Sequence, residues 1–210
     1  MVMRSTAAFA LCLLALAACQ TPVPLTATPA FTTSPALAAR NPAEIAVLSP
    51  EDATETKDAT RLLEYMREVM EQQLVDRCYT PLRTQVVDAA LGGARPGRGE
   101  TVLTPAYLKR IAGRATEEAL LAVRVDRWDE GSLLADKTVS FQFQAALIGN
   151  DGESLWHGSL SGTVKAGGFG AAPRDRLEMA RSCAKIALTA LLEHLPTRPP
   201  SAGRPTESGR

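Results

Sequence analysis

The chain has 210 residues, of which 23 are Lys or Arg and 23 are Asp or Glu, so its formal net charge is zero. This balance gives none of the excess positive charge that nucleic-acid binding requires, and we expect no nucleic-acid partner. Once an N-terminal signal is removed, the remaining length suits a single globular domain.

The first 18 residues have the pattern of an export signal. Arg4 precedes an apolar run from Ala7 to Ala18 that is too short to span a bilayer as a permanent helix. The run leads into Leu16-Ala17-Ala18-Cys19, which resembles the bacterial lipobox, in which the cysteine is diacylated and becomes the new N-terminus after cleavage. We therefore predict a signal peptide over residues 1–18 and lipid attachment at Cys19. The alternative is an ordinary secretory signal that is cut beside an unmodified cysteine.

The position of the lipid anchor sets the expected location. Residue 20 is Gln rather than Asp, and in lipoproteins of this kind that resemblance favours the outer membrane of a bacterium with two membranes. Several acyl chains on one cysteine bind a membrane more firmly than the marginal, reversible binding of a single chain. We expect a protein that is lipid-anchored in the outer membrane and faces the periplasm.

The two ends of the mature chain are predicted to be unstructured. Residues 19–42 follow the lipid site with mainly Thr, Pro and Ala, without charge until Arg40 and without apolar periodicity, which is typical of a flexible tether. Residues 196–210 are rich in Pro, Gly, Ser and Arg, and we predict a disordered tail. The folded domain is therefore expected to span residues 43–195.

The first half of this domain is predicted to contain two strands and a helix. The apolar run from Ile45 to Leu48 ends at Ser49-Pro50 and suits a buried strand. Apolar residues then recur at helical spacing from Leu62 to Leu74, with charged residues on the other side. A second strand is expected over residues 78–82 and 86–87, with Pro81 at an edge or a bend.

The second half is predicted to contain a helix, three consecutive strands and a closing helix. Pro105 at the first helical position begins a helix through Ala112, and an apolar strand over residues 120–125 runs towards Trp128. Residues 138–148 alternate between apolar and polar, and a turn at Asn150-Asp151-Gly152 connects them to a partner strand over residues 155–164. An apolar stripe from Leu177 to Leu195 predicts a long C-terminal helix. The order predicts an α/β fold in which helices cover a mixed β-sheet, with a late hairpin and a closing helix.

Several of these segments resemble one group of envelope proteins. They are residues 45–50, the helix that follows, the strand after Gly113 and above all Asn150-Asp151-Gly152-Glu153-Ser154-Leu155-Trp156-His157-Gly158. They are similar to the small lipoproteins whose domain is shared with the curli secretion lipoprotein CsgG and the penicillin-binding-protein activator LpoB, and most of all to an uncharacterised branch of that group. The resemblance covers residues 43–195 and the lipobox. It implies a periplasmic module that binds other envelope proteins.

Two cysteines remain in the mature domain, because Cys12 leaves with the signal and Cys19 carries the lipid. Cys78 and Cys183 are a candidate disulfide, since a bridge persists in an oxidising periplasm. The alternative is two separate buried thiols that behave as small apolar residues.

The two tryptophans are assigned different roles. Trp128 is a candidate interface residue because exposed aromatic side chains dominate binding hot spots. Trp156 shares a strand face with Leu160 and Val164 and is expected in the core.

The sequence has no motif that predicts catalysis, a cofactor or a metal. Gly158-Ser159-Leu160-Ser161-Gly162 has Leu160 where a nucleophile elbow requires its serine. The glycines of residues 167–170 are followed by no acidic residue at the dinucleotide spacing. His157 and His194 have no Cys, Asp or Glu beside them at metal-ligand spacing. We expect neither an enzyme nor a cofactor.

The sequence therefore predicts a lipid-anchored accessory or scaffold protein of the cell envelope. Its partners are expected to be the membrane, through the lipid, and envelope or periplasmic proteins, with a second copy of the chain as a further candidate. One alternative is an activator of a peptidoglycan synthase, as the resemblance to LpoB implies. Another is an envelope hydrolase that uses Cys78, His157 or Ser161.

Overall fold

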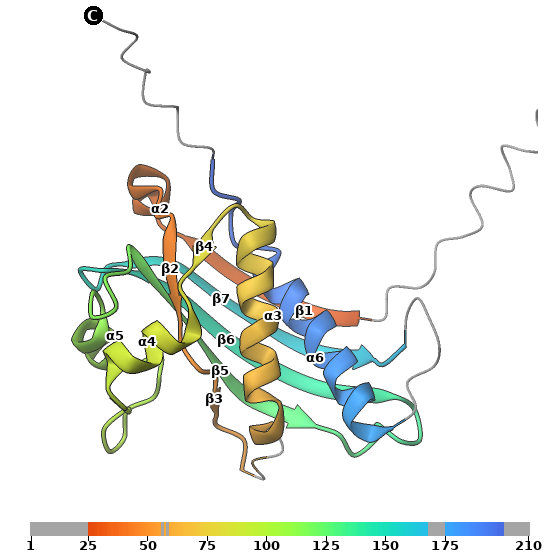
Figure 1. Ribbon diagram of the computed structural model, residues 1–210. Coiled ribbons are helices and arrows are strands. Elements are labelled where there is room, and N and C mark those ends of the chain that lie inside the picture. The colour runs from red at the N-terminus through yellow and green to blue at the C-terminus, as the bar shows by residue number, and fades with distance from the viewer. Residues whose placement is uncertain (1–24, 56, 58, 168–174, 200–210) are drawn as a thin grey trace, which may run out of the picture.

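A single mixed sheet of seven strands organises the domain (Figure 1). The computed structural model describes residues 25–55, 57, 59–167 and 175–199, so the predicted signal peptide and Cys19 lie outside the described residues. The strand order is β1-β7-β6-β5-β2-β4, and β3 pairs with β5. The elements are β1 (Leu25–Thr33), α2 (Pro35–Arg40), β2 (Glu44–Val47), β3 (Glu51–Asp52), η2 (Thr60–Leu62), α3 (Leu63–Asp76), β4 (Thr80–Pro81), α4 (Thr84–Leu91), α5 (Pro105–Ile111), β5 (Ala119–Asp129), β6 (Thr138–Gly149), β7 (Ser154–Lys165) and α6 (Arg176–Leu192).

The sheet is antiparallel on one side and parallel on the other. β5, β6, β7 and β1 form an antiparallel series, whereas β2 runs parallel to both β5 and β4. Two-residue β4 forms an edge and contains Pro81, as the sequence predicts for a residue without a backbone donor. The predicted fold class, a mixed sheet with helices and a long C-terminal helix, is confirmed.

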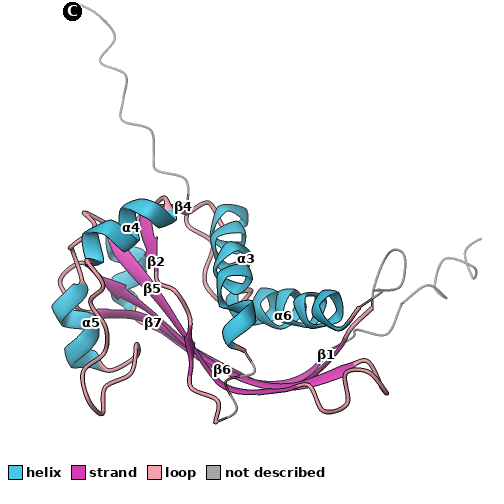
Figure 2. Cartoon of the chain, turned by 60° about the horizontal axis from the view of Figure 1, so that its bottom comes forward, coloured by secondary structure: helices cyan, strands magenta, loops and turns pink. Residues whose placement is uncertain are grey.

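Two apolar cores lie on the two faces of the sheet. α3 and α6 cover one face and form the larger core, and α4 and α5 cover part of the other face (Figure 2). The alternation of β6 explains this division. Val139, Phe141, Phe143, Ala145 and Leu147 enter the larger core, whereas Ala146 and Ile148 enter the smaller one. The predicted apolar face of this strand is thus confirmed.

Residues 86–87 are helical, so the prediction of a strand there is wrong. Both lie in α4, where Val87 is fully buried in the smaller core and Val86 is exposed. Ala90 and Leu91 pack beside Val87 at the next turn. Gly92 ends the helix with a φ of 57°, a conformation that glycine adopts without a Cβ penalty. Helical burial of one face overrides the strand preference of two β-branched residues.

The flexible tether predicted over residues 19–42 is wrong from residue 25 onward. β1 pairs with β7 along its whole length, from Leu25 opposite Val164 to Thr33 opposite Trp156. Leu25, Ala27 and Phe31 pack against the larger core, and these alternating positions explain why the strand forms. The folded domain therefore includes residues from Leu25 onward, and residues 20–24 lie between Leu25 and Cys19 in the sequence.

The short helix α2 ties the segment after β1 to the hairpin. Ser34 caps α2 by accepting a hydrogen bond from Ala36 N at 3.2 Å, and its own backbone N donates to Leu155 O at 2.9 Å. The Arg40 guanidinium donates to Asp151 at 2.6 Å and also to Glu153, both in the β6–β7 turn. Arg40 holds the pKa of the Asp151 carboxyl below its usual range.

The predicted disordered tail is wrong for residues 196–199. The Tyr79 hydroxyl donates to the Pro196 carbonyl oxygen at 2.8 Å, and Arg198 N donates to the Arg77 carbonyl oxygen at 2.9 Å. These bonds fix the chain beyond α6 against the end of α3. Residues 200–210 lie outside the described residues. Within the described part of the chain, none of the helices has the length and apolar character needed to cross a membrane.

Candidate functional site

A charged cluster surrounds the buried carboxylate of Glu130, directly after β5. Its side chain is 1% exposed. Oε1 accepts a hydrogen bond from Trp128 Nε1 at 2.9 Å. Oε2 accepts one from Arg176 Nε at 2.9 Å and another from the Arg61 guanidinium. A single carboxylate thus connects β5, η2 and the start of α6.

The hydrogen bonds to Glu130 determine its charge state. Burial alone raises the pKa of the Glu130 carboxyl, but the bonds from Arg61, Trp128 and Arg176 outweigh that effect and place the pKa below its ordinary value. The carboxylate is therefore ionised at neutral pH. Arg61 and Arg176 are about half exposed, with side chains 46% and 50% accessible, so both remain partly open to solvent.

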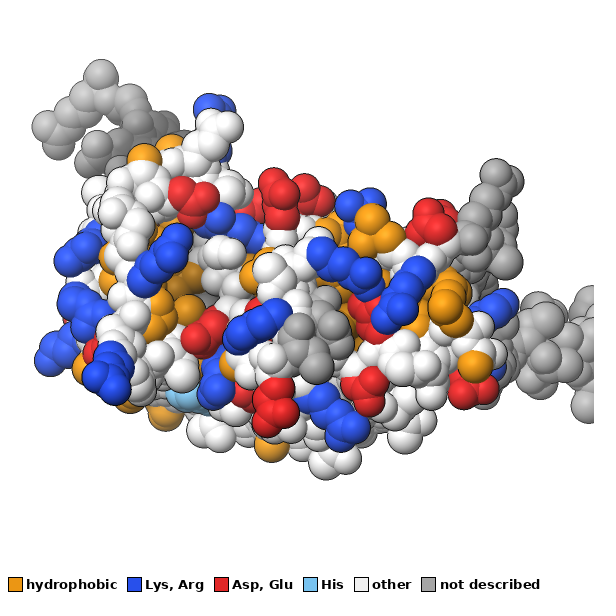
Figure 3. Space-filling view, turned by 90° about the horizontal axis from the view of Figure 1, so that it is seen from below, with side chains coloured by type: hydrophobic (Ala, Val, Ile, Leu, Met, Phe, Trp, Pro, Cys, Tyr) orange, Lys and Arg blue, Asp and Glu red, His pale blue; other side chains and the backbone are white. Residues whose placement is uncertain are grey.

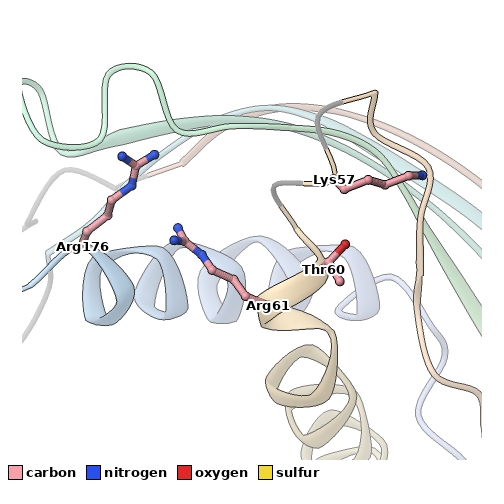
Figure 4. A pocket seen from close by; sticks show the side chains of 4 residues that line it. All are labelled: Lys57, Thr60, Arg61 and Arg176. Carbon is pink, nitrogen blue, oxygen red and sulfur yellow. The ribbon is translucent and has the colours of Figure 1, made fainter.

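The same two arginines line an open cavity of about 330 Å³ together with Lys57 and Thr60 (Figure 4). In Figure 4 the guanidinium groups of Arg61 and Arg176 point towards the same space from two elements, whereas the Lys57 side chain lies on the opposite side and points away from both arginines. Lys57 Nζ donates to the Asp52 carbonyl oxygen at 2.6 Å. Thr60 Oγ1 donates to Asp52 Oδ2 at 2.7 Å.

Among the described residues, the charged side chains that line this cavity are all cationic. They are Lys57, Arg61 and Arg176; both arginines bind the Glu130 carboxylate, and Asp52 accepts a hydrogen bond from Thr60. Guanidinium and ammonium groups are the donors that proteins use to bind carboxylates and phosphates. The cavity is thus chemically suited to an anion.

A second feature is the polar face of the sheet over β1, β7 and β6, which no helix of the described residues covers (Figure 2). The register places the same kinds of side chain side by side across the three strands, for example Thr28, Ser161 and Gln142. Gln142 is exposed, and Gln144 beside it donates to Asp126 Oδ2 at 2.6 Å. The polar side chains of this uncovered face are Thr26, Thr28, Thr32, Ser140, Gln142, Gln144, His157, Ser159, Ser161 and Thr163.

The predicted disulfide is absent, and both cysteines are free thiols. Cys183 is buried on α6, where its Sγ lies 3.9 Å from the Val164 carbonyl oxygen of β7. Cys78 is exposed and follows α3, next to the β4 edge. β4 and β7 lie far apart in the strand order, which explains why the two thiols do not meet. Burial raises the pKa of the Cys183 thiol to about 12, so it is neutral.

Trp128 is a core residue, so its assignment to an interface is wrong. It is 2% exposed, and its indole N–H is already used by Glu130. Its ring lies over Phe143 with centroids 6.1 Å apart. Trp156 is 1% exposed, which confirms its predicted place in the core.

The structure does not bring the candidate hydrolase residues together. His157 and Ser161 lie on the same strand four residues apart, which places their Cα atoms about 13 Å from each other. Cys78 lies at the β4 edge, and three strands (β2, β5 and β6) lie between β4 and β7 in the sheet order. Among the described residues, His, Cys, Asp and Glu form no group of three or more that is placed to bind a metal ion.

Sequence reasoning missed the Glu130 cluster. Trp128 and Glu130 at the end of a strand were its only local signal, because strand alternation places both side chains on the same face. The arginines that complete the cluster lie 69 and 46 residues away along the chain. Their meeting depends on how η2 and α6 pack, which sequence periodicity does not specify.

The described residues define a mixed α/β sheet domain. No family model matches the chain, and no curated protein matches it. The structure is similar to PelC L103M, solved as a dodecamer from Paraburkholderia phytofirmans, with 17% identity and a TM-score of 0.50 over 83% of this chain and 100% of that chain. The likeness to PelC concerns the fold.

Two further solved structures have a lower likeness. The lipoprotein GNA1162 from Neisseria meningitidis is 21% identical, with a TM-score of 0.41 over 58% of this chain and 84% of that chain. The C-terminal domain of LpoB from Salmonella enterica is 16% identical, with a TM-score of 0.38 over 59% of this chain and 82% of that chain. The similar structures thus include a lipoprotein and the LpoB domain, at low sequence identity.

Proposed function

We propose that the chain is a lipid-anchored accessory or scaffold protein of the cell envelope, which faces the periplasm from the outer membrane and performs no chemistry of its own. Its domain binds other envelope proteins or further copies of itself. The observation that carries this proposal is the uncovered polar face of β1, β7 and β6. The dodecamer formed by PelC, which has a similar fold, supports self-association as one form of this binding.

The uncovered face has the chemistry of a docking surface. Hydroxyl and amide side chains in adjacent rows offer donors and acceptors in a fixed geometry, because the sheet fixes their spacing. Protein interfaces use about one hydrogen bond per 100–200 Å², with a polar rim. A broad sheet face of this kind suits a macromolecular partner better than a small substrate, which binds in a concave and mostly apolar pocket.

Activation of a peptidoglycan synthase is a finer form of the same proposal. It rests on the sequence resemblance to LpoB, and no contact in the described structure favours a synthase over another envelope protein. A crosslinked partner with synthase activity is the outcome that would select it.

Site-specific crosslinking tests the docking surface. A photoreactive residue is placed at Gln142 on the uncovered face, and a matched one at Gln72 on the exposed side of α3. After irradiation of living cells, Gln142 is expected to give at least one reproducible adduct, either a dimer of this chain or a complex with an envelope protein. Gln72 is expected to give none of comparable yield. Equal yields at the two positions, or no adduct at Gln142, would contradict the proposal.

The lipid anchor has a separate test. The mature polypeptide is expected to begin at Cys19 and to carry fatty acid there, and Cys19→Ser is expected to abolish both processing at this position and retention in the membrane fraction. Intact-mass analysis of the protein extracted from membranes measures this directly. A mature chain that starts at another residue, or that carries no acyl group, would refute the anchor and leave the docking surface untouched.

A further inference from the structure

The cavity lies at the same end of the sheet as the segment that leads to the predicted anchor. β1 begins at Leu25, which pairs with Val164 near the end of β7. At the same end of the sheet, Lys165 of β7 pairs with Thr138 at the start of β6. Ser140 of β6 pairs in turn with Asp129 at the end of β5. Glu130 follows Asp129 and binds both cavity arginines. The register therefore aligns the start of β1 with the cavity.

The distances involved are short. Six residues from Cys19 to Leu25 span at most about 20 Å when extended. β1 and β5 are separated by three strand spacings, or about 15 Å. If Cys19 carries lipid, as we propose above, the cavity lies within reach of the membrane surface.

Exposed leucines lie at this end as well. Leu134, in the loop between β5 and β6, is 66% exposed, and Leu177, beside Arg176 at the start of α6, is 37% exposed. Only two other large apolar side chains of the described residues, Val75 and Val86, are classed with them as exposed. Exposed apolar side chains next to cationic ones are typical of surfaces that contact the interfacial region of a bilayer.

The positive charge at this end is local. Seen from below, basic and acidic side chains are interspersed over the surface (Figure 3). Asp129 pairs with Arg127, and Asp175 caps α6 by accepting from Glu178 N. Diffuse attraction to an anionic surface is therefore weak here. Among the described residues, the cations gather at the cavity of Lys57, Arg61 and Arg176.

From these observations we infer that this cavity binds a phosphate group, supplied by the headgroup of a lipid in the membrane that holds the anchor. Two guanidinium groups oriented by Glu130 supply the charge that faces the cavity, and Lys57 and Thr60 line its other side. Bound in this way, the headgroup would hold the anchor end of the sheet against the bilayer. The choice of a lipid as the source rests on the proposed function, whereas the phosphate chemistry of the cavity does not.

The test uses the chain from Gln20 to Arg210, which contains every described residue and lacks the lipid. Binding to vesicles of phosphatidylglycerol and phosphatidylcholine is measured by co-sedimentation. A second arm titrates inorganic phosphate by calorimetry at matched ionic strength. We expect binding to the vesicles, and we expect Lys57→Gln, Arg61→Gln and Arg176→Gln each to weaken it about fivefold. Lys57→Gln leaves the Glu130 cluster intact, so its result does not depend on folding of the cluster.

Two lysines serve as controls. Lys165→Gln removes a charge from the same end outside the cavity, and Lys109→Gln removes one from exposed α5 near the opposite turn. Both are expected to leave vesicle binding unchanged within twofold. Equal losses from Lys57→Gln and Lys165→Gln would overturn the site, as would absence of binding in both arms. Binding of inorganic phosphate without vesicle binding would overturn the lipid as its source. Because the chain tested has no Cys19, none of these results depends on the anchor.

Discussion

Replacement of Glu130 by alanine is expected to lower the free energy of unfolding by about 3 kcal/mol. The carboxylate is buried and accepts from Trp128, Arg61 and Arg176. Its removal leaves the indole N–H buried without an acceptor and opens a cavity between β5, η2 and α6. Because both arginines are about half exposed, water solvates them after the change, and the loss is smaller than for a fully buried ion pair.

Urea unfolding followed by circular dichroism measures this loss of stability. Glutamine at the same position separates the contribution of the negative charge from that of the hydrogen bond to Trp128. Glu130→Gln keeps an oxygen that accepts from Trp128 Nε1 but removes the charge, and a loss of about 1.5 kcal/mol is expected. Arg61→Ala and Arg176→Ala are each expected to cost at most about 1 kcal/mol. A loss below about 0.5 kcal/mol for Glu130→Ala, within the range of ordinary surface substitutions, would show that the cluster does not stabilise the fold.

The same carboxylate gives stability a defined pH dependence. Its pKa is lower in the folded protein than its ordinary value, so its ionised form stabilises the fold above the unfolded pKa of about 4.3. This contribution is lost as the pH falls from there through the folded pKa. The difference in unfolding free energy between the native chain and Glu130→Gln is thus expected to be constant from pH 7 to about pH 5 and to shrink below about pH 4.

The parts of the fold that sequence predicts well are those determined by local patterns. The alternation of residues 138–148, the Asn150-Asp151-Gly152 turn and the returning strand define one hairpin, and each is visible within about a dozen residues. The stripes of α3 and α6 are equally local. Once the sheet forms, the apolar stripes of α3 and α6 pack on the sheet face that carries the apolar side chains of β6.

The parts that sequence failed to predict depend on distant partners. β1 has three inward residues, Leu25, Ala27 and Phe31, separated by Thr and interrupted by Pro29, and in isolation this composition matches a flexible linker. It becomes a strand because β7 presents an unpaired edge more than a hundred residues later. The Glu130 cluster is not predicted from the sequence for the same reason, because its arginines come from two elements that are remote in the chain. The prediction of Trp128 as an interface residue is wrong because the sequence does not reveal that Glu130 accepts a hydrogen bond from its buried indole N–H.

Replacement of Gly162 by alanine is expected to cost about 3 kcal/mol or to release β1 from the sheet. Gly162 lies on β7 opposite Ala27. A Cβ at this position would overlap the Thr26 carbonyl oxygen and lie 2.8 Å from Ala27 Cα. Both are backbone atoms, so no side-chain rotation relieves the clash and β1 itself must move. Its displacement would expose the packed side of Phe31 and leave β7 as a new open edge, which favours aggregation.

Hydrogen exchange of the β1 amides, compared with those of α3, separates these two outcomes. In Gly162→Ala we expect rapid exchange over residues 25–33 with α3 still protected, since β1 is an edge strand and α3 packs elsewhere in the core. The matched control is Ser161→Ala, one residue earlier on the uncovered face, where the new side chain is smaller and a change within about 0.5 kcal/mol is expected. If Gly162→Ala left both stability and exchange unchanged, residues 25–33 would not be docked on β7 in solution. The domain would then begin after residue 42, and the anchor end of the sheet would no longer be held near the membrane.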